Sequence, residues 1–167
     1  MKTEHLHLIP VDFVHEKEIF DNYTKDVSKY LLSEPHLNIA YTHELVNMFI
    51  RQKNAGSDYI FTLLHNETNE FLGLAGIHDI NNGASLGVWL KISAQGKGYG
   101  TECVEILIDY AKKFGIKKLI YKVHIENKAS KKLIANYCKK RISDYEVETT
   151  DAGKVVEYEV YEIKIAP

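Results

Sequence analysis

Three glycines stand within five residues between an apolar run and a helical pattern, an arrangement suited to holding phosphate. Glycine turns tightly without a Cβ clash and leaves backbone N–H groups free to point at an anion where a helix begins. The helix dipole adds to that attraction. We therefore expect this loop to bind a phosphorylated ligand, although glycines before a helix can also serve only to make a tight turn. The loop comprises Gln95, Gly96, Lys97, Gly98, Tyr99, Gly100 and Thr101.

Other phosphate-binding loops fit this segment less well. The pattern GxxxxGK[ST] is absent from the chain. The dinucleotide pattern GxGxxG would need a glycine where Thr101 stands. The loop alone also leaves open a phosphate-binding interaction domain with no preference for one nucleotide ligand.

A second motif lies about 30 residues downstream, again where a strand pattern passes into a helical one. Residues Leu119 to Ile125 have the composition of a strand, and they lead directly into a short polar segment. That segment reads Glu126, Asn127, Lys128, Ala129 and Ser130.

Together the two motifs resemble the GNAT superfamily of acyltransferases, in which a Q-x-x-G-x-G loop holds the pyrophosphate of acetyl-CoA. The E-N-x-x-S element is similar to that of the RimJ/RimL branch, the N-terminal acetyltransferases of ribosomal proteins. The resemblance covers nearly the whole chain and implies one acetyltransferase domain over residues 1–167. It implies an α/β (α+β) fold with a mixed, mostly antiparallel sheet of about six to seven strands, splayed between two central parallel strands and flanked by helices.

The same resemblance implies the chemistry. Acetyl-CoA is the cosubstrate, no metal is needed, and a primary amine attacks the thioester directly in a ternary complex. The acceptor is a protein N-terminus or a small molecule such as a polyamine or an aminoglycoside. Backbone groups near Leu90 would pair with the pantetheine amides and polarise the carbonyl. Asn127 would hold the pantetheine arm, cap the following helix, or do both.

Two positions depart from the pattern of these relatives. Many GNAT enzymes carry a tyrosine as general acid about seven residues after the asparagine, where this chain has Ile134. Ser130, or a water that it orders, is then the candidate proton donor. RimJ/RimL-like chains often carry a glutamate where this chain has Ser85. His78 is the first substitute as general base because of its intrinsic pKa, with Asp79 and Glu126 behind it.

These departures leave a second class of function open, an acyl-CoA-binding module with little or no catalysis. Cys103 is not a plausible nucleophile, because it lies in the apolar stripe of a helical pattern without a companion base. Cys103 and Cys138 are placed in separate helical segments, have no metal-ligand spacing, and suit a cytoplasmic protein.

Composition fits one globular domain, with 167 residues of which 45% are hydrophobic and 26% charged. No run approaches the roughly 20 apolar residues of a membrane span, and the polar N-terminus predicts no signal peptide. Residues 91–141 carry 13 Lys/Arg and four Asp/Glu, although the whole chain has a net charge of −2. This basic half would attract the phosphates of CoA. No motif indicates a nucleic-acid partner, and a monomer and a homodimer both remain open.

Periodicity and turn residues predict the elements that position the two motifs. Helices are expected over 11–23, over 42–53 with Thr42 as N-cap, and over 99–114 with Gly115 as the stop. Strands are expected over 4–9, 59–65, 71–80, 85–91 and 119–125, with a terminal hairpin over 142–149 and 155–165. The last strand before the second motif must run parallel to the strand before the glycine loop, because a helix intervenes. Both ligands would then bind where these two strands diverge.

Overall fold

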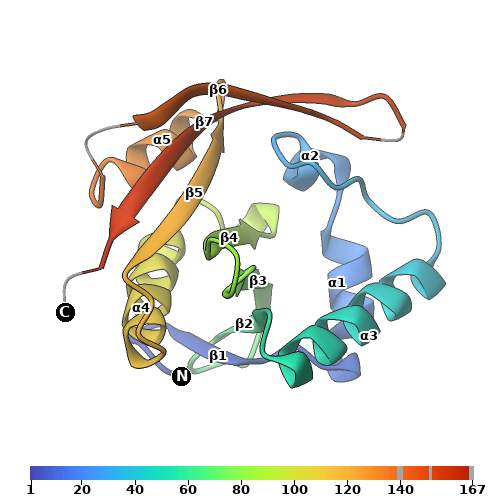
Figure 1. Cartoon of the computed structure of the whole chain (residues 1–167). Coiled ribbons are helices and arrows are strands. Elements are labelled where there is room, and N and C mark those ends of the chain that lie inside the picture. The colour runs from blue at the N-terminus through green and yellow to red at the C-terminus, as the bar shows by residue number, and fades with distance from the viewer. Residues whose placement is uncertain (139–140, 151, 166–167) are drawn as a thin grey trace.

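The computed structural model describes residues 1–138, 141–150 and 152–165. Within them, seven strands form one sheet in the order β1-β2-β3-β4-β5-β7-β6 (Figure 1). Neighbouring strands are antiparallel except for β4 and β5, which are parallel. The mixed, mostly antiparallel sheet that the resemblance implied is confirmed. The strands are β1 (Leu6–Pro10), β2 (Tyr59–His65), β3 (Phe71–His78), β4 (Ser85–Leu90), β5 (Lys118–His124), β6 (Arg141–Thr149) and β7 (Val155–Lys164).

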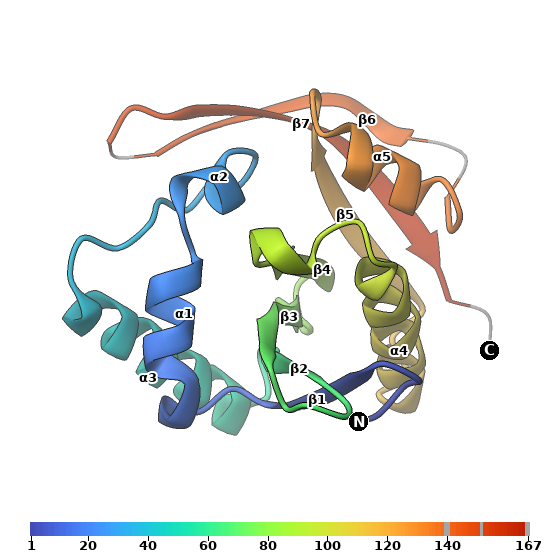
Figure 2. The ribbon, with the colours of Figure 1, turned by 180° about the vertical axis from the view of Figure 1, so that it is seen from behind.

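Helices cover both faces of the central strands. Helices α1 and α3 lie on one side and α4 on the other, while α5 lies between α4 and the terminal hairpin (Figures 1 and 2). No helix among the described residues has the length and apolar composition to cross a bilayer. The helices are η1 (Phe13–His15), α1 (Glu16–Asn22), α2 (Lys25–Ser28), α3 (Ile39–Ala55), η2 (Ile92–Ala94), α4 (Tyr99–Lys113) and α5 (Lys128–Ile134).

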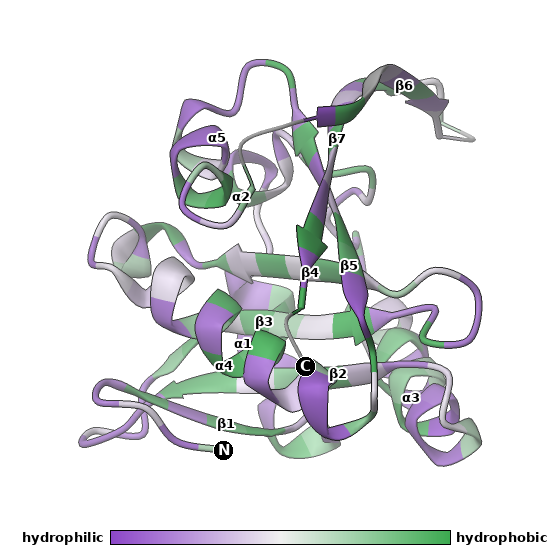
Figure 3. Cartoon of the chain, turned by 60° about the vertical axis from the view of Figure 1, so that its left-hand side comes forward, coloured by the Kyte–Doolittle hydropathy of each residue, from purple (hydrophilic) through white to green (hydrophobic). Residues whose placement is uncertain are grey.

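The core has two parts, one against each face of the sheet. Val104 and Leu107 of α4 are fully buried in the larger part, and Val46 of α3 is fully buried in the smaller part. Because β2 and β3 are covered on both faces, they carry continuous apolar runs rather than alternating patterns. Their hydrophobic colouring contrasts with the mixed colouring of the surface helices (Figure 3).

Several expected boundaries are wrong at helix ends. The expected helix over 11–23 is a short 3-10 turn followed by α1, which ends at Asn22. Helix α3 begins three residues before Thr42, because Asn38 is its cap and accepts a hydrogen bond from the backbone N–H of Ala40 at 2.9 Å. The Thr42 hydroxyl is instead buried and lies 2.9 Å from Nδ1 of His36. Cys138 lies beyond the end of α5 and not in a helix.

The parallel pair in the centre of the sheet is splayed. Its register holds a single pair, Ser85 with Ile120, near the start of β4. From there to Leu90 the two strands share no further pair, so a gap opens toward their C-terminal ends. The glycine loop follows β4 at this gap, and the second motif follows β5.

The terminal hairpin of β6 and β7 extends over α2 (Figure 1). Nζ of Lys154 donates a hydrogen bond to the carbonyl of Ser28 at 2.9 Å and lies 3.1 Å from Oε1 of Glu34. This contact joins residues more than a hundred positions apart in the chain. It holds α2, a helix of four residues, at the edge of the splayed gap.

Candidate active site

The glycine loop presents a row of unused backbone donors. Five consecutive N–H groups, from Gly96 to Gly100, donate no hydrogen bond to any part of the chain that the structure describes. Gly96 and Gly98 have φ of 73° and 88°, in the left-handed region that favours glycine. A Cβ added at either glycine would meet no atom within 4 Å, so the space beside the loop is open. The row meets the N-terminus of α4, whose dipole favours an anion.

Gln95 fastens this loop to the end of β4. Its Nε2 donates a hydrogen bond to the Leu90 carbonyl at 3.0 Å. The glutamine therefore fixes the distance between the end of the strand and the row of free N–H groups. The side chain also lines the pocket that the loop borders.

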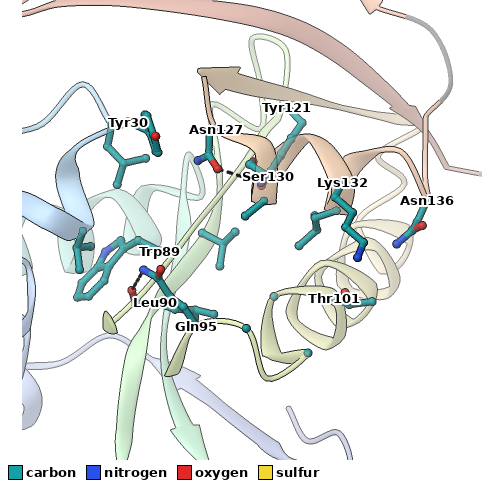
Figure 4. A pocket seen from close by; sticks show the side chains of 18 of the residues that line it. Tyr30, Trp89, Leu90, Gln95, Thr101, Tyr121, Asn127, Ser130, Lys132 and Asn136 are labelled. Carbon is teal, nitrogen blue, oxygen red and sulfur yellow. Dashed lines mark hydrogen bonds between the residues drawn. The ribbon is translucent and has the colours of Figure 1, made fainter. Parts of the chain in front are cut away.

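A pocket of about 430 Å³ lies in the splayed gap. This volume is within the usual range for small-ligand sites. Strand β4 supplies Val88, Trp89 and Leu90 on one side. Tyr121 of β5 and the first turns of α5 form the opposite side (Figure 4). The site thus depends on the divergence of the two parallel strands.

The α5 wall carries two polar side chains that the second motif predicted. Oδ1 of Asn127 accepts a hydrogen bond from the backbone N–H of Ser130 at 3.0 Å, so Asn127 is the helix cap. Its side-chain amide also lines the pocket, and the structure describes no partner for Nδ2. The Ser130 hydroxyl lies 3.1 Å from the hydroxyl of Tyr121. Burial raises the pKa of Tyr121, so this phenol stays protonated at neutral pH.

The two ends of the pocket differ in charge. Thr101, Lys132 and Asn136 lie at the end beside the glycine loop, and Tyr30 and Trp89 lie at the other end (Figure 4). Asp26 of α2 is the one acidic side chain among the described residues that line the pocket. An anionic ligand is therefore favoured at one end and a cationic ligand at the other.

Most of the site residues proposed from sequence share this pocket. Lys97 and Tyr99 do not line it with their side chains: Lys97 is exposed, and the Tyr99 ring turns toward His5 and His65, with ring centroids 6.2 and 6.1 Å away. The residues brought together are Leu90, Gln95, Gly96, Gly98, Gly100, Thr101, Asn127 and Ser130.

The structure does not bring His78 to the pocket. Strands β3 and β4 are antiparallel, so His78 at the end of β3 pairs with Ser85 at the start of β4. The pocket lies at the other end of β4, at Leu90. His78 is instead paired with Asp58, with Nδ1 3.2 Å from Oδ1. His78, Asp79 and Glu126 are absent from the pocket lining, and a Cβ at Gly87 would lie 3.1 Å from Nε2 of His78. The assignment of His78 as general base stays a prediction.

Sequence reasoning missed Tyr121 and the residues of α2. The sequence did contain a signal for Tyr121. Leu119, Tyr121 and Val123 alternate along β5, which predicts that they share one buried face, as they do. The position of α2 had none, since it depends on contacts with the distant hairpin. Cys103 is fully buried, and burial raises the pKa of its thiol, which agrees with its exclusion as a nucleophile.

Comparison with known proteins gives the family. The model of the family described as "Acetyltransferase (GNAT) domain" matches residues 5–137. The "Uncharacterized N-acetyltransferase p20" of Bacillus licheniformis is 28% identical over 138 residues, which cover 79% of this chain and 77% of the relative. Because the family match spans most of the chain, the protein belongs to the GNAT acetyltransferases.

Solved structures share the fold across nearly the whole chain. A GNAT-family acetyltransferase from Bacillus anthracis superposes with a TM-score of 0.81 at 20% identity, covering 98% of this chain and 97% of that one. Spermidine N-acetyltransferase from Vibrio cholerae, solved with CoA and spermine, gives 0.79 at 18% identity with coverages of 98% and 97%. RimL, a ribosomal L7/L12 alpha-N-protein acetyltransferase solved with CoA, gives 0.79 at 20% with coverages of 98% and 96%.

Proposed function

We propose that this protein transfers the acetyl group of acetyl-CoA to a primary amine by direct attack, with both substrates held in the splayed pocket. The observation that carries this proposal is the row of free N–H groups from Gly96 to Gly100, which opens onto the pocket at the start of α4. A phosphorylated ligand supplies the acceptors that these donors lack. Two of the similar structures were solved with CoA, which supports the choice of ligand.

The residues present fit acetyl-CoA along the length of the pocket. The loop N–H groups and Lys132 would hold the phosphates, and the end of β4 and the amide of Asn127 would hold the pantetheine arm. When bound, this cosubstrate supplies an activated thioester. Ser130 faces the same pocket and would donate a hydrogen bond to the sulfur as negative charge develops there. Fixing both substrates in one geometry supplies much of the catalysis in a direct transfer.

The acceptor amine would enter from the side of α2. Asp26 attracts a protonated amine, and Tyr30 and Trp89 offer aromatic surfaces that suit a cation or an alkyl chain. Tyr23 packs edge-on against Trp89 with ring centroids 5.0 Å apart, which fixes the indole at this end. Relatives that acetylate spermidine and a protein N-terminus share the fold, so both acceptor classes belong in any screen.

Release of free thiol from acetyl-CoA tests this function. We expect release that depends on added amine, in a panel of a polyamine, an aminoglycoside and a peptide with a free N-terminus. A protein that binds CoA tightly but releases no thiol with any member would be a binding module instead.

Replacing Asp26 with asparagine should raise KM for a cationic amine about three- to fivefold, because the change removes one exposed attractive charge. The effect should shrink at high salt, since exposed charges are screened. Affinity for CoA should stay within about twofold of the parent. Asp109→Asn removes the same charge from the exposed surface of α4 and is the matched control. An equal KM in the Asp26 variant and the parent would place the acceptor elsewhere.

A further inference from the structure

Tyr121 and Ser130 form a hydroxyl pair at the wall of the pocket. Tyr121 comes from the middle of β5 and Ser130 from the first turn of α5, and their oxygens lie 3.1 Å apart. Both residues line the pocket, and Figure 4 shows them side by side next to Asn127. The pair joins a rigid central strand to the helix that follows it.

Either hydroxyl could donate in this pair, and the burial of the two residues favours donation by the phenol. The Tyr121 side chain is 5% exposed and its phenol stays protonated, while Ser130 is only partly buried. When the phenol donates to Oγ of Ser130, the serine hydrogen is left free to point into the pocket. The reverse direction would aim the serine hydrogen at the core side, away from any ligand. The backbone of Ser130 is already fixed by the Asn127 cap.

We propose that Tyr121 is a positioning residue that donates to Ser130 and so aims the serine hydroxyl at the sulfur of the leaving thiolate. This inference rests on the proposed function. As the amine nitrogen bonds to the acetyl carbon, the C–S bond breaks and its electron pair stays on sulfur. The Ser130 hydroxyl donates a hydrogen bond to that charge, and the proton lost from nitrogen passes to solvent. Ile134 supplies no donor, because its side chain is aliphatic, and it is buried in the core at 1% exposure.

Tyr161 provides a matched control on the adjacent strand. It stands directly opposite Tyr121 in the β5–β7 register. Its hydroxyl donates to Oε2 of Glu159 at 2.7 Å, and it does not line the pocket. Burial and the contact with Glu159 raise the pKa of Tyr161 to about 12, so this phenol is also protonated at neutral pH. Removing either hydroxyl therefore deletes one buried or half-buried hydrogen bond, but only one of them serves the site.

The test replaces each tyrosine with phenylalanine, which keeps the ring. We expect Tyr121→Phe to lower kcat roughly five- to tenfold, since the serine hydroxyl loses the partner that orients it. KM for acetyl-CoA and affinity for CoA should stay within about twofold of the parent. Tyr161→Phe should match the parent in all three measurements.

A second readout does not depend on turnover. The pKa of the thiol in bound CoA, followed by the ultraviolet absorbance of the thiolate, should be lower in the parent than in Tyr121→Phe or Ser130→Ala. The reason is that a hydrogen bond donated to the thiolate favours the charged form. Tyr161→Phe should leave this pKa unchanged.

Three results would overturn the positioning role. The first is an unchanged thiol pKa in Tyr121→Phe, and the second is a loss of CoA affinity in that variant. The third is an equal loss of kcat from Tyr121→Phe in the parent and in Ser130→Ala, because a residue that acts through serine has no effect once serine is gone. If the parent shows no turnover, the proposed function fails, and the thiol pKa still decides whether Tyr121 aims Ser130.

Discussion

Replacing Gly98 with valine should remove most of the thermal stabilisation that CoA gives the parent protein. A ligand bound only to the folded state stabilises it by about 2.7 kcal/mol at a hundredfold excess over Kd. Gly98 has φ of 88° and stands as the cap of α4, with open space where its side chain would project. A branched side chain there strains the backbone and covers the N–H row, so we expect Kd for CoA to rise roughly hundredfold.

Gly115 separates the effect on binding from the effect on folding. It lies just beyond the opposite end of α4, has φ of 70°, and also has no atom within 4 Å of an added Cβ. Gly115→Val should therefore lower Tm through similar backbone strain while leaving the response to CoA intact. Normal CoA binding by Gly98→Val would mean that the loop is only a turn. Equal stabilisation of the parent by ATP and CoA would contradict the choice of ligand.

Ser130→Ala should lower kcat by about ten- to a hundredfold, equivalent to roughly 1.4 to 2.7 kcal/mol of transition-state stabilisation. A hydroxyl that donates to sulfur matters most when charge develops there, so KM for acetyl-CoA should change little. Steady-state kinetics with a saturating amine separate the two constants. The loss of kcat should exceed that of Tyr121→Phe. Ser130→Ala removes the donor hydroxyl itself, whereas Tyr121→Phe removes only the partner that orients this hydroxyl.

Two comparisons make the Ser130 result interpretable. Ser57→Ala removes a hydroxyl that donates to the Gln52 carbonyl at 3.3 Å, away from the pocket, and should leave kcat unchanged. His78→Ala tests the sequence-based assignment of the base directly. Because His78 does not line the pocket, we expect the parent rate and the parent pH profile, and a lower rate would support His78 as the base. If Ser130→Ala turns over at the parent rate, Ser130 does not contribute, and catalysis depends only on the alignment of the substrates and on water.

The parts of the site that sequence could predict are those encoded by local residue types. Glycine spacing before an amphipathic helix indicates a phosphate loop, and Gly96 and Gly98 do adopt positive φ. Asn127 after a strand indicates a helix cap, which the structure confirms. Strand β2 coincides with the expected strand over 59–65, since buried β-rich runs bounded by turn residues are a strong signal.

What escaped prediction depends on contacts between distant segments. His78 was proposed as the base by residue type, but the antiparallel pairing of β3 and β4 places it opposite Ser85 and outside the pocket lining. Tyr121 reaches Ser130 only because α5 folds back beside β5. Helix α2 reaches the pocket under a hairpin held by Lys154, more than a hundred residues later. Thr42 was expected to cap the second helix, but α3 begins earlier and Asn38 is its cap, accepting a hydrogen bond from the backbone N–H of Ala40.

The fate of a labelled acetyl group tests the central claim most directly. The protein is mixed with acetyl-CoA that carries an isotopically labelled acetyl group, together with an amine that supports thiol release, and mass spectra of the amine and the protein are recorded. We expect the label on the amine nitrogen, because transfer is direct. For the same reason the protein should carry no label, whether or not the amine is present. Label on the protein, or CoA binding without label on any amine of the panel, would contradict a direct acetyl transfer in this pocket.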